Sequence, residues 1–273
     1  MRDKLILGRM IPTGSRVHEL DPRAKITAML LFAAALILSG GWAELAVLAV
    51  FSVIVLTATK IPLRTYLRAL RPLRWLMLFV FLFQLFAGAG AGAAADSAAW
   101  TLGPVTLTAA GLSGALLAVS RMALLIVFTA MLTFTTTPSM LSRGIEGMIK
   151  PLSRKGSTGA ERFSLMMRLA LRFIPALLEE SQTILKAQAA RGADYEEMKI
   201  KEKARLLMSL LVPVTVGAFR RAEELTTSLE ARGYRIGAPR TSYRRLSWSG
   251  ADTFFTLLFV LLLAGTLTMR LML

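Results

Sequence analysis

The chain contains no cysteine and only one histidine, His18, among its 273 residues. The absence of cysteine excludes disulfides, a thiol nucleophile and every cysteine-ligated metal site. A single histidine is too few for a histidine-based metal site or a catalytic triad, so we expect neither a metal nor a cofactor. The phosphate-binding motif G-x-x-x-x-G-K-[ST] is also missing, which excludes ATP hydrolysis by the usual P-loop mechanism.

Charged residues are scarce as well. They make up 18% of the chain, hydrophobic residues make up 55%, and the mean hydropathy is +0.57, whereas soluble domains average about 25% charged residues. The 33 lysines and arginines nevertheless outnumber the 17 acids, which gives a net charge of +16. A nucleic-acid-binding domain carries such an excess as a patch on an ordinary globular composition. Here the charges form blocks between long uncharged runs, which is typical of an integral membrane protein and argues against a nucleic-acid partner.

Apolar runs predict an all-α polytopic membrane protein with about five spans. The interval between Lys25 and Lys60 has no lysine or arginine and fits two compact helices joined by a turn at Ser39–Trp42, or one kinked segment. Asp21 is a good N-cap for the first helix, and Pro22 suits its first position. The remaining spans are expected at Trp75 to about Ala87, about Leu112 to Phe134, and Thr253 to Met269.

Lysine and arginine cluster on alternate sides of these spans. They precede the first span and fill the loop after the second: Arg2, Lys4, Arg9, Arg16, Arg23 and Lys25, then Lys60, Arg64, Arg68, Arg71 and Arg74. The Ser39–Trp42 turn and the Ala87–Leu112 loop contain none. By the positive-inside rule this is a multi-pass protein of the cell membrane with a cytoplasmic N-terminus and an external C-terminus. Arg270 is the one charge against this orientation.

A long basic segment, residues 138–249, separates the N-terminal membrane region, residues 1–137, from the C-terminal span, residues 250–273. Loops of this length normally have structure of their own, and periodicity predicts two long helices, about Ala160 to Arg191 and about Glu196 to Arg232. The apolar middle of the second helix is interrupted by Pro213 and Gly217. We interpret it as lying along the membrane rather than as a sixth crossing.

Paired acids occur on these two helices and offer the main sites for acid–base chemistry. They are Glu179/Glu180, Glu196/Glu197 and Glu223/Glu224, all among lysines and arginines. Solvated helix faces with charge pairs between residues i and i+4 explain them better than catalysis does. We therefore expect a protein that is not an enzyme.

Both long helices end in the same triplet. The first closes with Ala190, Arg191 and Gly192, and the second with Ala231, Arg232 and Gly233. Such endings are common, because glycine adopts the left-handed conformation after a helix and a cation suits the negative end of the helix dipole. Repetition at two successive helix ends indicates, as an alternative, two equivalent contact points on a two-fold or pseudo-two-fold partner.

Arg121 lies well inside the fourth span, where an arginine costs about 2.5–3.5 kcal/mol on insertion scales. Two interpretations stay open. The side chain reaches the membrane interface or bonds to Gln84 or to backbone, or it makes a specific contact that holds the span or a partner subunit.

Several motifs together resemble the transmembrane T component of energy-coupling factor (ECF) transporters, the EcfT/CbiQ-type family. They are the two Ala-Arg-Gly triplets, LDPR at Leu20–Arg23, TFTTTP at Thr133–Pro138 and LRFIP at Leu171–Pro175. The resemblance covers essentially the whole chain and is specific in combination. It implies a membrane scaffold that joins two ABC-type ATPases to a small membrane-embedded S component that binds the vitamin. It also implies that the two triplets dock into grooves on the ATPases.

The function expected from this resemblance is coupling of ATP hydrolysis to vitamin or micronutrient uptake by a non-catalytic subunit in the lipid bilayer. The alternative is the permease subunit of a different ABC transporter, which would carry its own substrate path. Such paths are usually marked by polar intramembrane residues, and here Arg121 and Gln84 stand out alone. A membrane enzyme is a third interpretation, and the single histidine, the absence of cysteine and the lack of a membrane-facing carboxylate cluster count against it.

Overall fold

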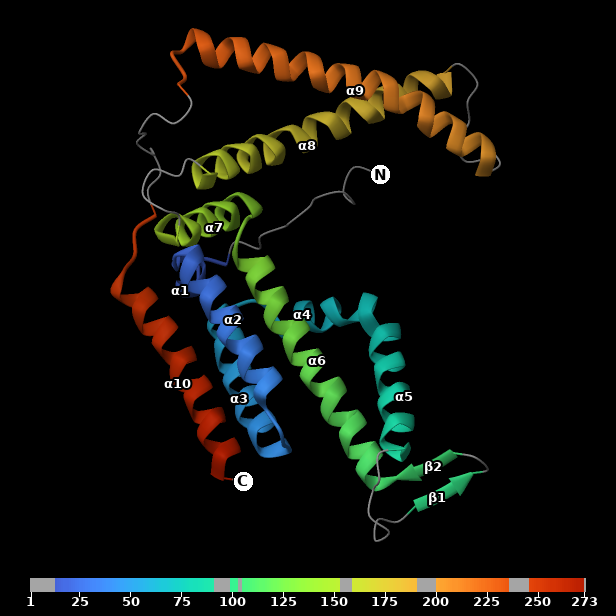
Figure 1. The fold of residues 1–273 in the computed structure, drawn as a ribbon, viewed down its shortest axis with the longest axis vertical. Coiled ribbons are helices and arrows are strands. Elements are labelled where there is room, and N and C mark those ends of the chain that lie inside the picture. Colours follow the sequence, from blue (N-terminus) through green and yellow to red (C-terminus); the bar gives the residue numbers. More distant parts are fainter. Residues whose placement is uncertain are drawn as a thin grey trace. The chain divides into compact units, whose positions relative to one another are not determined.

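The computed structural model describes residues 13–90, 99–102, 105–152, 159–190, 200–235 and 246–272 (Figure 1). Helices dominate, and the chain forms two compact units. Unit 1 contains residues Met1–Gly147 and Leu246–Leu273, and unit 2 contains Met148–Arg245. The all-α class expected from the sequence is confirmed. The exception within the described residues is a hairpin of β1 (Ala99–Leu102) and β2 (Val105–Thr108), which pairs Trp100 with Leu107 in an antiparallel register.

The first helices of unit 1 follow the sequence closely. The single turn α1 (Arg16–Glu19) precedes α2 (Pro22–Leu38), and α3 (Trp42–Ala58) follows after a short turn. The Asp21 side chain accepts a hydrogen bond from the backbone N–H of Arg23 at 2.9 Å, so the predicted N-cap is confirmed. The interval between Lys25 and Lys60 therefore holds two helices rather than one kinked segment.

Four helices of unit 1 meet in an aromatic core. Phe32 of α2 stacks on Phe128 of α6 (Ala109–Thr135) with ring centroids 4.2 Å apart. Phe259 of α10 (Gly250–Met272) packs edge-on against Phe128 at 5.5 Å and against Phe51 of α3 at 4.9 Å. Phe32, Phe128 and Phe259 are at most 1% exposed. Because lipid tails are as apolar as these side chains, close packing rather than escape from water holds such a core together.

Within the residues that the structure describes, three helical stretches are long and apolar enough to cross a membrane: Leu63–Phe86, Gly111–Thr135 and Gly250–Met272. Helices α2 and α3 are also apolar but have 17 residues each, which corresponds to about 25 Å of helix and to the lower end of the usual range for a span. The protein is therefore a polytopic membrane protein. The first of the three stretches combines α4 (Leu63–Leu70), a 3₁₀ turn η1 (Arg71–Leu73) and α5 (Arg74–Gly90).

Helix α7 (Pro138–Leu152), which precedes the two long helices, was not expected from the sequence. Two of its glycines allow it to lie directly on the start of α2. A Cβ atom at Gly144 would lie 2.9 Å from Cβ of Pro22, and a Cβ atom at Gly147 would overlap the guanidinium of Arg23. At these two positions the backbone of α7 packs where a side chain would usually lie.

Unit 2 contains two helices of 32 residues each, α8 (Gly159–Ala190) and α9 (Ile200–Ala231), which cross each other (Figure 1). Their bounds agree with the predicted ones to within four residues. Pro213 interrupts the apolar run of α9 but not the helix, which continues through this residue as α8 does through Pro175. A proline removes one backbone hydrogen bond, and in α9 good helix formers such as Leu210 and Leu211 precede it.

Candidate functional site

The ends of α8 and α9 carry the two triplets. Ala190 is the last residue of α8, while Arg191 and Gly192 lie outside the described residues. The second triplet is described in full: Ala231 ends α9, and Arg232 and Gly233 form the turn that follows.

Gly233 ends α9 in a left-handed conformation, with φ at +70°. Its N–H donates to the carbonyl of Glu230 at 2.9 Å, and the N–H of Tyr234 donates to the carbonyl of Leu229 at 2.9 Å. These two bonds form a Schellman motif, which satisfies carbonyls that a helix end otherwise leaves free. No atom lies within 4 Å of the position of a Cβ on Gly233, so the backbone conformation alone favours glycine here.

The side chain of Arg232 takes no part in this cap. The cap is made by backbone groups, and the backbone N–H of Arg232 contributes a longer bond to the carbonyl of Ser228 at 3.3 Å. The side chain is exposed, and no carboxylate in the described part of the chain forms an ion pair with it. The capping interpretation therefore accounts for the glycine but gives the arginine no structural task beyond its favourable position near the helix dipole.

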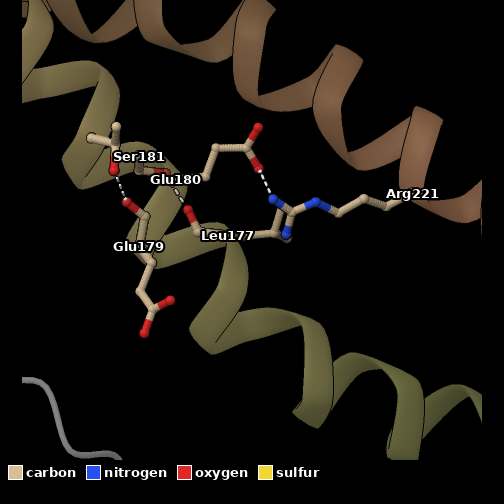
Figure 2. A network of polar contacts seen from close by, with 6 residues as sticks. Leu177, Glu179, Glu180, Ser181 and Arg221 are labelled. Carbon is tan, nitrogen blue, oxygen red and sulfur yellow. Dashed lines mark hydrogen bonds and ion pairs between the residues drawn. The ribbon is translucent and has the colours of Figure 1, made fainter.

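An ion pair joins the two long helices where they cross (Figure 2). The Arg221 guanidinium of α9 lies 2.8 Å from the Glu180 carboxylate of α8, and the two side chains are 36% and 25% exposed. The pair borders an open hollow of about 460 Å³, lined by Ala176, Glu179, Glu180, Thr183, Ile184 and Arg221. From the sequence, Glu180 was expected to form a charge pair between residues i and i+4 on a solvated helix face. Its partner lies instead on the other helix, although both side chains stay partly exposed.

Gly217 brings the backbone of α9 close to this pair. A Cβ at Gly217 would lie 2.5 Å from Oε1 of Glu180 and 3.2 Å from its Cδ. Gly217 precedes Arg221 by four residues and so shares a helix face with it. The glycine, interpreted from the sequence as an interruption, thus leaves space for the carboxylate at the crossing.

Arg121 of α6 binds backbone rather than Gln84. Its Nη2 donates to the carbonyl of Ser39, and Nη1 of Arg270 donates to the carbonyl of Leu38 at 2.9 Å. Both carbonyls belong to the C-terminal end of α2, where cations are favoured by the helix dipole. Glu44, which is 2% exposed, accepts a hydrogen bond from the N–H of Gly40 in the same turn. Two arginines from distant helices therefore fasten the α2–α3 turn.

Two further charged residues are buried and bind distant segments, which the sequence did not predict. Lys25, 1% exposed, donates from Nζ to the carbonyls of His18 at 3.0 Å and Thr135 at 3.3 Å. Asp252, also 1% exposed, accepts from the backbone N–H of Asp21 at 2.7 Å. A charged residue near the start of a helix can be exposed to solvent or buried against a distant segment. The sequence does not distinguish these two cases.

Comparison with known proteins agrees with the motifs. Residues 14–243 match the family CbiQ, described as cobalt transport protein. The chain is 38% identical over 253 residues to the "energy-coupling factor transporter transmembrane protein EcfT" of Listeria innocua, and equally so to that of Bacillus subtilis, with 93% of each chain covered in both cases. The protein of the same name from Bacillus selenitireducens is 35% identical over 272 residues, which cover 100% of this chain and 99% of that protein.

Membership rests on three agreements: the family match spans most of the chain, the relatives cover it almost end to end, and the apolar helices have the lengths of membrane spans. The chain therefore belongs to the CbiQ family and is a transmembrane T component of the energy-coupling factor transporter type.

Proposed function

We propose that this T component couples ATP hydrolysis by two cytoplasmic ABC-type ATPases to vitamin or micronutrient uptake through a membrane-embedded S component. The relatives are named as transmembrane proteins of energy-coupling factor transporters. This chain lacks the P-loop motif, so ATP hydrolysis is assigned to partner subunits. In this proposal the subunit is non-catalytic, lies in the cell membrane, and has its N-terminus and residues 138–249 on the cytoplasmic side.

The observation that carries the proposal is the exposed Arg232 on a rigidly capped helix end. An arginine held there forms charge-assisted hydrogen bonds when a partner presents carboxylates or carbonyls in a groove. Arg191 occupies the corresponding position in the first triplet. In this proposal Ala190, Arg191 and Gly192 contact one ATPase, and Ala231, Arg232 and Gly233 contact the other.

The crossing of α8 and α9 supplies the link between the two contact points. Each helix is continuous over 32 residues, so a displacement of its end moves the whole element rather than a local loop. Glu180 and Arg221 join the helices through an ion pair. Movement of the ATPases would then change the angle between the helices, and their exposed apolar faces would transmit that change to the S component.

Substitution of the arginines tests the proposal. We expect Arg191→Ala and Arg232→Ala each to leave the protein inserted but to reduce vitamin uptake sharply, because truncating a buried interface arginine costs about 2 kcal/mol or more. The double variant should lose most ATPase association, since two contact points reinforce each other through effective concentration.

The matched control is Lys201→Ala, which removes an exposed cation from the other end of α9. Uptake and co-purification of the ATPases would be measured in the same membranes. A double arginine variant with the uptake and ATPase association of the control would reduce both triplets to ordinary helix caps.

A further inference from the structure

The segment from the end of α3 to the start of α5 carries a concentration of positive charge without any acid. It contains Lys60, Arg64, Arg68, Arg71 and Arg74, and no Asp or Glu occurs between Glu44 and Asp96. All five cations are exposed. Within the described ranges, none of them forms an ion pair with a carboxylate. Carboxylates of the described residues therefore leave this positive charge unneutralised.

Two of these cations border an apolar hollow of about 480 Å³. Arg71 and Arg74 lie at one part of its lining, while Met77, Leu78 and Phe81 of α5 and Val119 of α6 contribute apolar surface. The α5 residues follow the arginines at intervals of three or four, so they continue along one helix face. The volume falls within the range of about 300–1,000 Å³ that is usual for small-molecule sites.

The surroundings place this hollow at the boundary between membrane and water. Helix α5 belongs to the span Leu63–Phe86, and Trp75, Phe79 and Phe83 are 69%, 64% and 63% exposed on it. The arginines precede this apolar part, and the Arg74 guanidinium lies 5.4 Å from the ring centre of Trp75. Tryptophan next to cations at the end of a span is typical of the headgroup region.

We propose that this hollow, which we call the Arg71–Arg74 groove, binds one anionic phospholipid. The headgroup phosphate would lie between the two guanidinium groups, whose fork of N–H donors matches phosphate oxygens. An acyl chain would lie along Met77, Leu78 and Phe81 against Val119. A lipid fits better than a protein partner, because a cationic rim that continues directly into a wholly apolar lining matches a molecule with one charged end and a hydrocarbon tail.

Native mass spectrometry of the full chain with defined lipids tests the proposal. The probes are phosphatidylglycerol and phosphatidylcholine with identical acyl chains, and we expect one phosphatidylglycerol to be retained in preference. The variant Arg71→Gln/Arg74→Gln should weaken retention of phosphatidylglycerol by roughly thirtyfold, because each cation near an anionic headgroup strengthens association several-fold.

Two matched variants separate the groove from general attraction between charges. Arg64→Gln/Arg68→Gln removes the same charge from α4 residues that do not line the groove, and it should retain the preference. Val119→Trp fills the groove without changing charge and should abolish retention. Equal losses in both double arginine variants, or no preference in the unchanged chain, would overturn the proposal.

The absence of native cysteine allows the occupant to be identified in cell membranes. A single Val119→Cys substitution, labelled with a photoactivatable maleimide, should form adducts with phospholipid on illumination. Crosslinking chiefly to another membrane protein, such as an S component, would assign the groove to that partner and refute the lipid site. This outcome is independent of the arginine triplets, so it leaves the proposed function intact.

Discussion

Unit 1 and unit 2 differ in what holds their helices together. In unit 1, phenylalanines from four helices bury one another, and charged side chains bind the ends of neighbouring helices. In unit 2, Leu210 alone among the side chains described there is buried, at 7% exposure. The middle of α9 instead exposes apolar side chains: Met208, Leu211, Val212, Val216 and Phe219 are 54–69% exposed. Unit 1 exposes apolar side chains too, such as Trp75 and Phe79 at 69% and 64%, but it also has a buried core, which the described part of unit 2 lacks. Since exposed apolar surface marks interaction sites, we expect unit 2 to depend on partners more than unit 1 does.

Removing the centre of the aromatic core should have the largest effect. We expect Phe259→Ala to lower the free energy of unfolding by about 3–5 kcal/mol, since it leaves a cavity where this ring packs against four other phenylalanine rings. The measurement is thermal unfolding of the purified chain in detergent. Phe254→Ala is the matched control, because Phe254 lies on the same helix and is 64% exposed. Equal destabilisation by both would show that the described core does not support unit 1.

A smaller loss is expected at the arginines that bind the end of α2. Arg121→Leu should destabilise unit 1 by about 1.5–3 kcal/mol, the usual range for a hydrogen bond made by a charged group. Arg121→Lys should cost less, because an ammonium group retains the charge near the helix dipole. Arg270→Leu is the comparison, since this side chain makes the same kind of bond at an exposed position. A stable Arg121→Leu variant would make the contact with Ser39 dispensable.

The smallest effects should appear at the helix crossing of unit 2. A double-mutant cycle on Glu180→Ala and Arg221→Ala should give a coupling free energy of about 0.2–1 kcal/mol, as for other partly exposed ion pairs. Hydrogen exchange of α8 and α9 would measure it locally, and unit 1 should be unaffected. A coupling free energy above this range would contradict the view that α8 and α9 are held together more weakly than the helices of unit 1.

Gly217 sharpens the same measurement. In the Glu180→Ala background, Gly217→Ala should stabilise α9 by up to about 1 kcal/mol through helix propensity. With Glu180 present, the gain should shrink, because the new Cβ displaces the carboxylate from its place beside Arg221. Gly265→Ala in α10 is the control, since no atom lies near its Cβ position. Equal gains in both backgrounds would mean that the crossing is looser than described.

Local signals were enough to predict much of the fold. Asp21 and Pro22 mark a helix start by a bond between neighbouring residues, and the absence of charge over long runs marks the spans. The hairpin β1–β2 was missed, because four-residue strands give too short an alternation next to a run of glycine and alanine. Helix α7 was also missed, although its apolar residues recur at helical spacing and could have revealed it: Leu141, Ile145, Met148 and Leu152.

Some features of the candidate site were also predictable from the sequence, whereas others were not. Arg232 and Gly233 were identified from sequence, because a repeated helix ending is a local pattern and the left-handed turn depends on glycine alone. The ion pair of Glu180 with Arg221 could not be, since 41 positions of chain separate the partners and each also fits a solvated helix face. Nor could the contact of Arg121 with Ser39 be told apart from one with Gln84, because both are polar groups within reach of an intramembrane arginine.

By itself, the sequence determined the family, the helical class, the long apolar helices of the membrane region and the glycine-capped end of α9. Each of these depends on composition, on periodicity or on residues adjacent in the chain. The tertiary structure alone decided which charges are buried, which carbonyls the intramembrane arginines bind and where the long helices cross. Those outcomes depend on partners brought together from distant parts of the chain, and the free energy of such a pair is set by its distance and burial, which no single segment encodes.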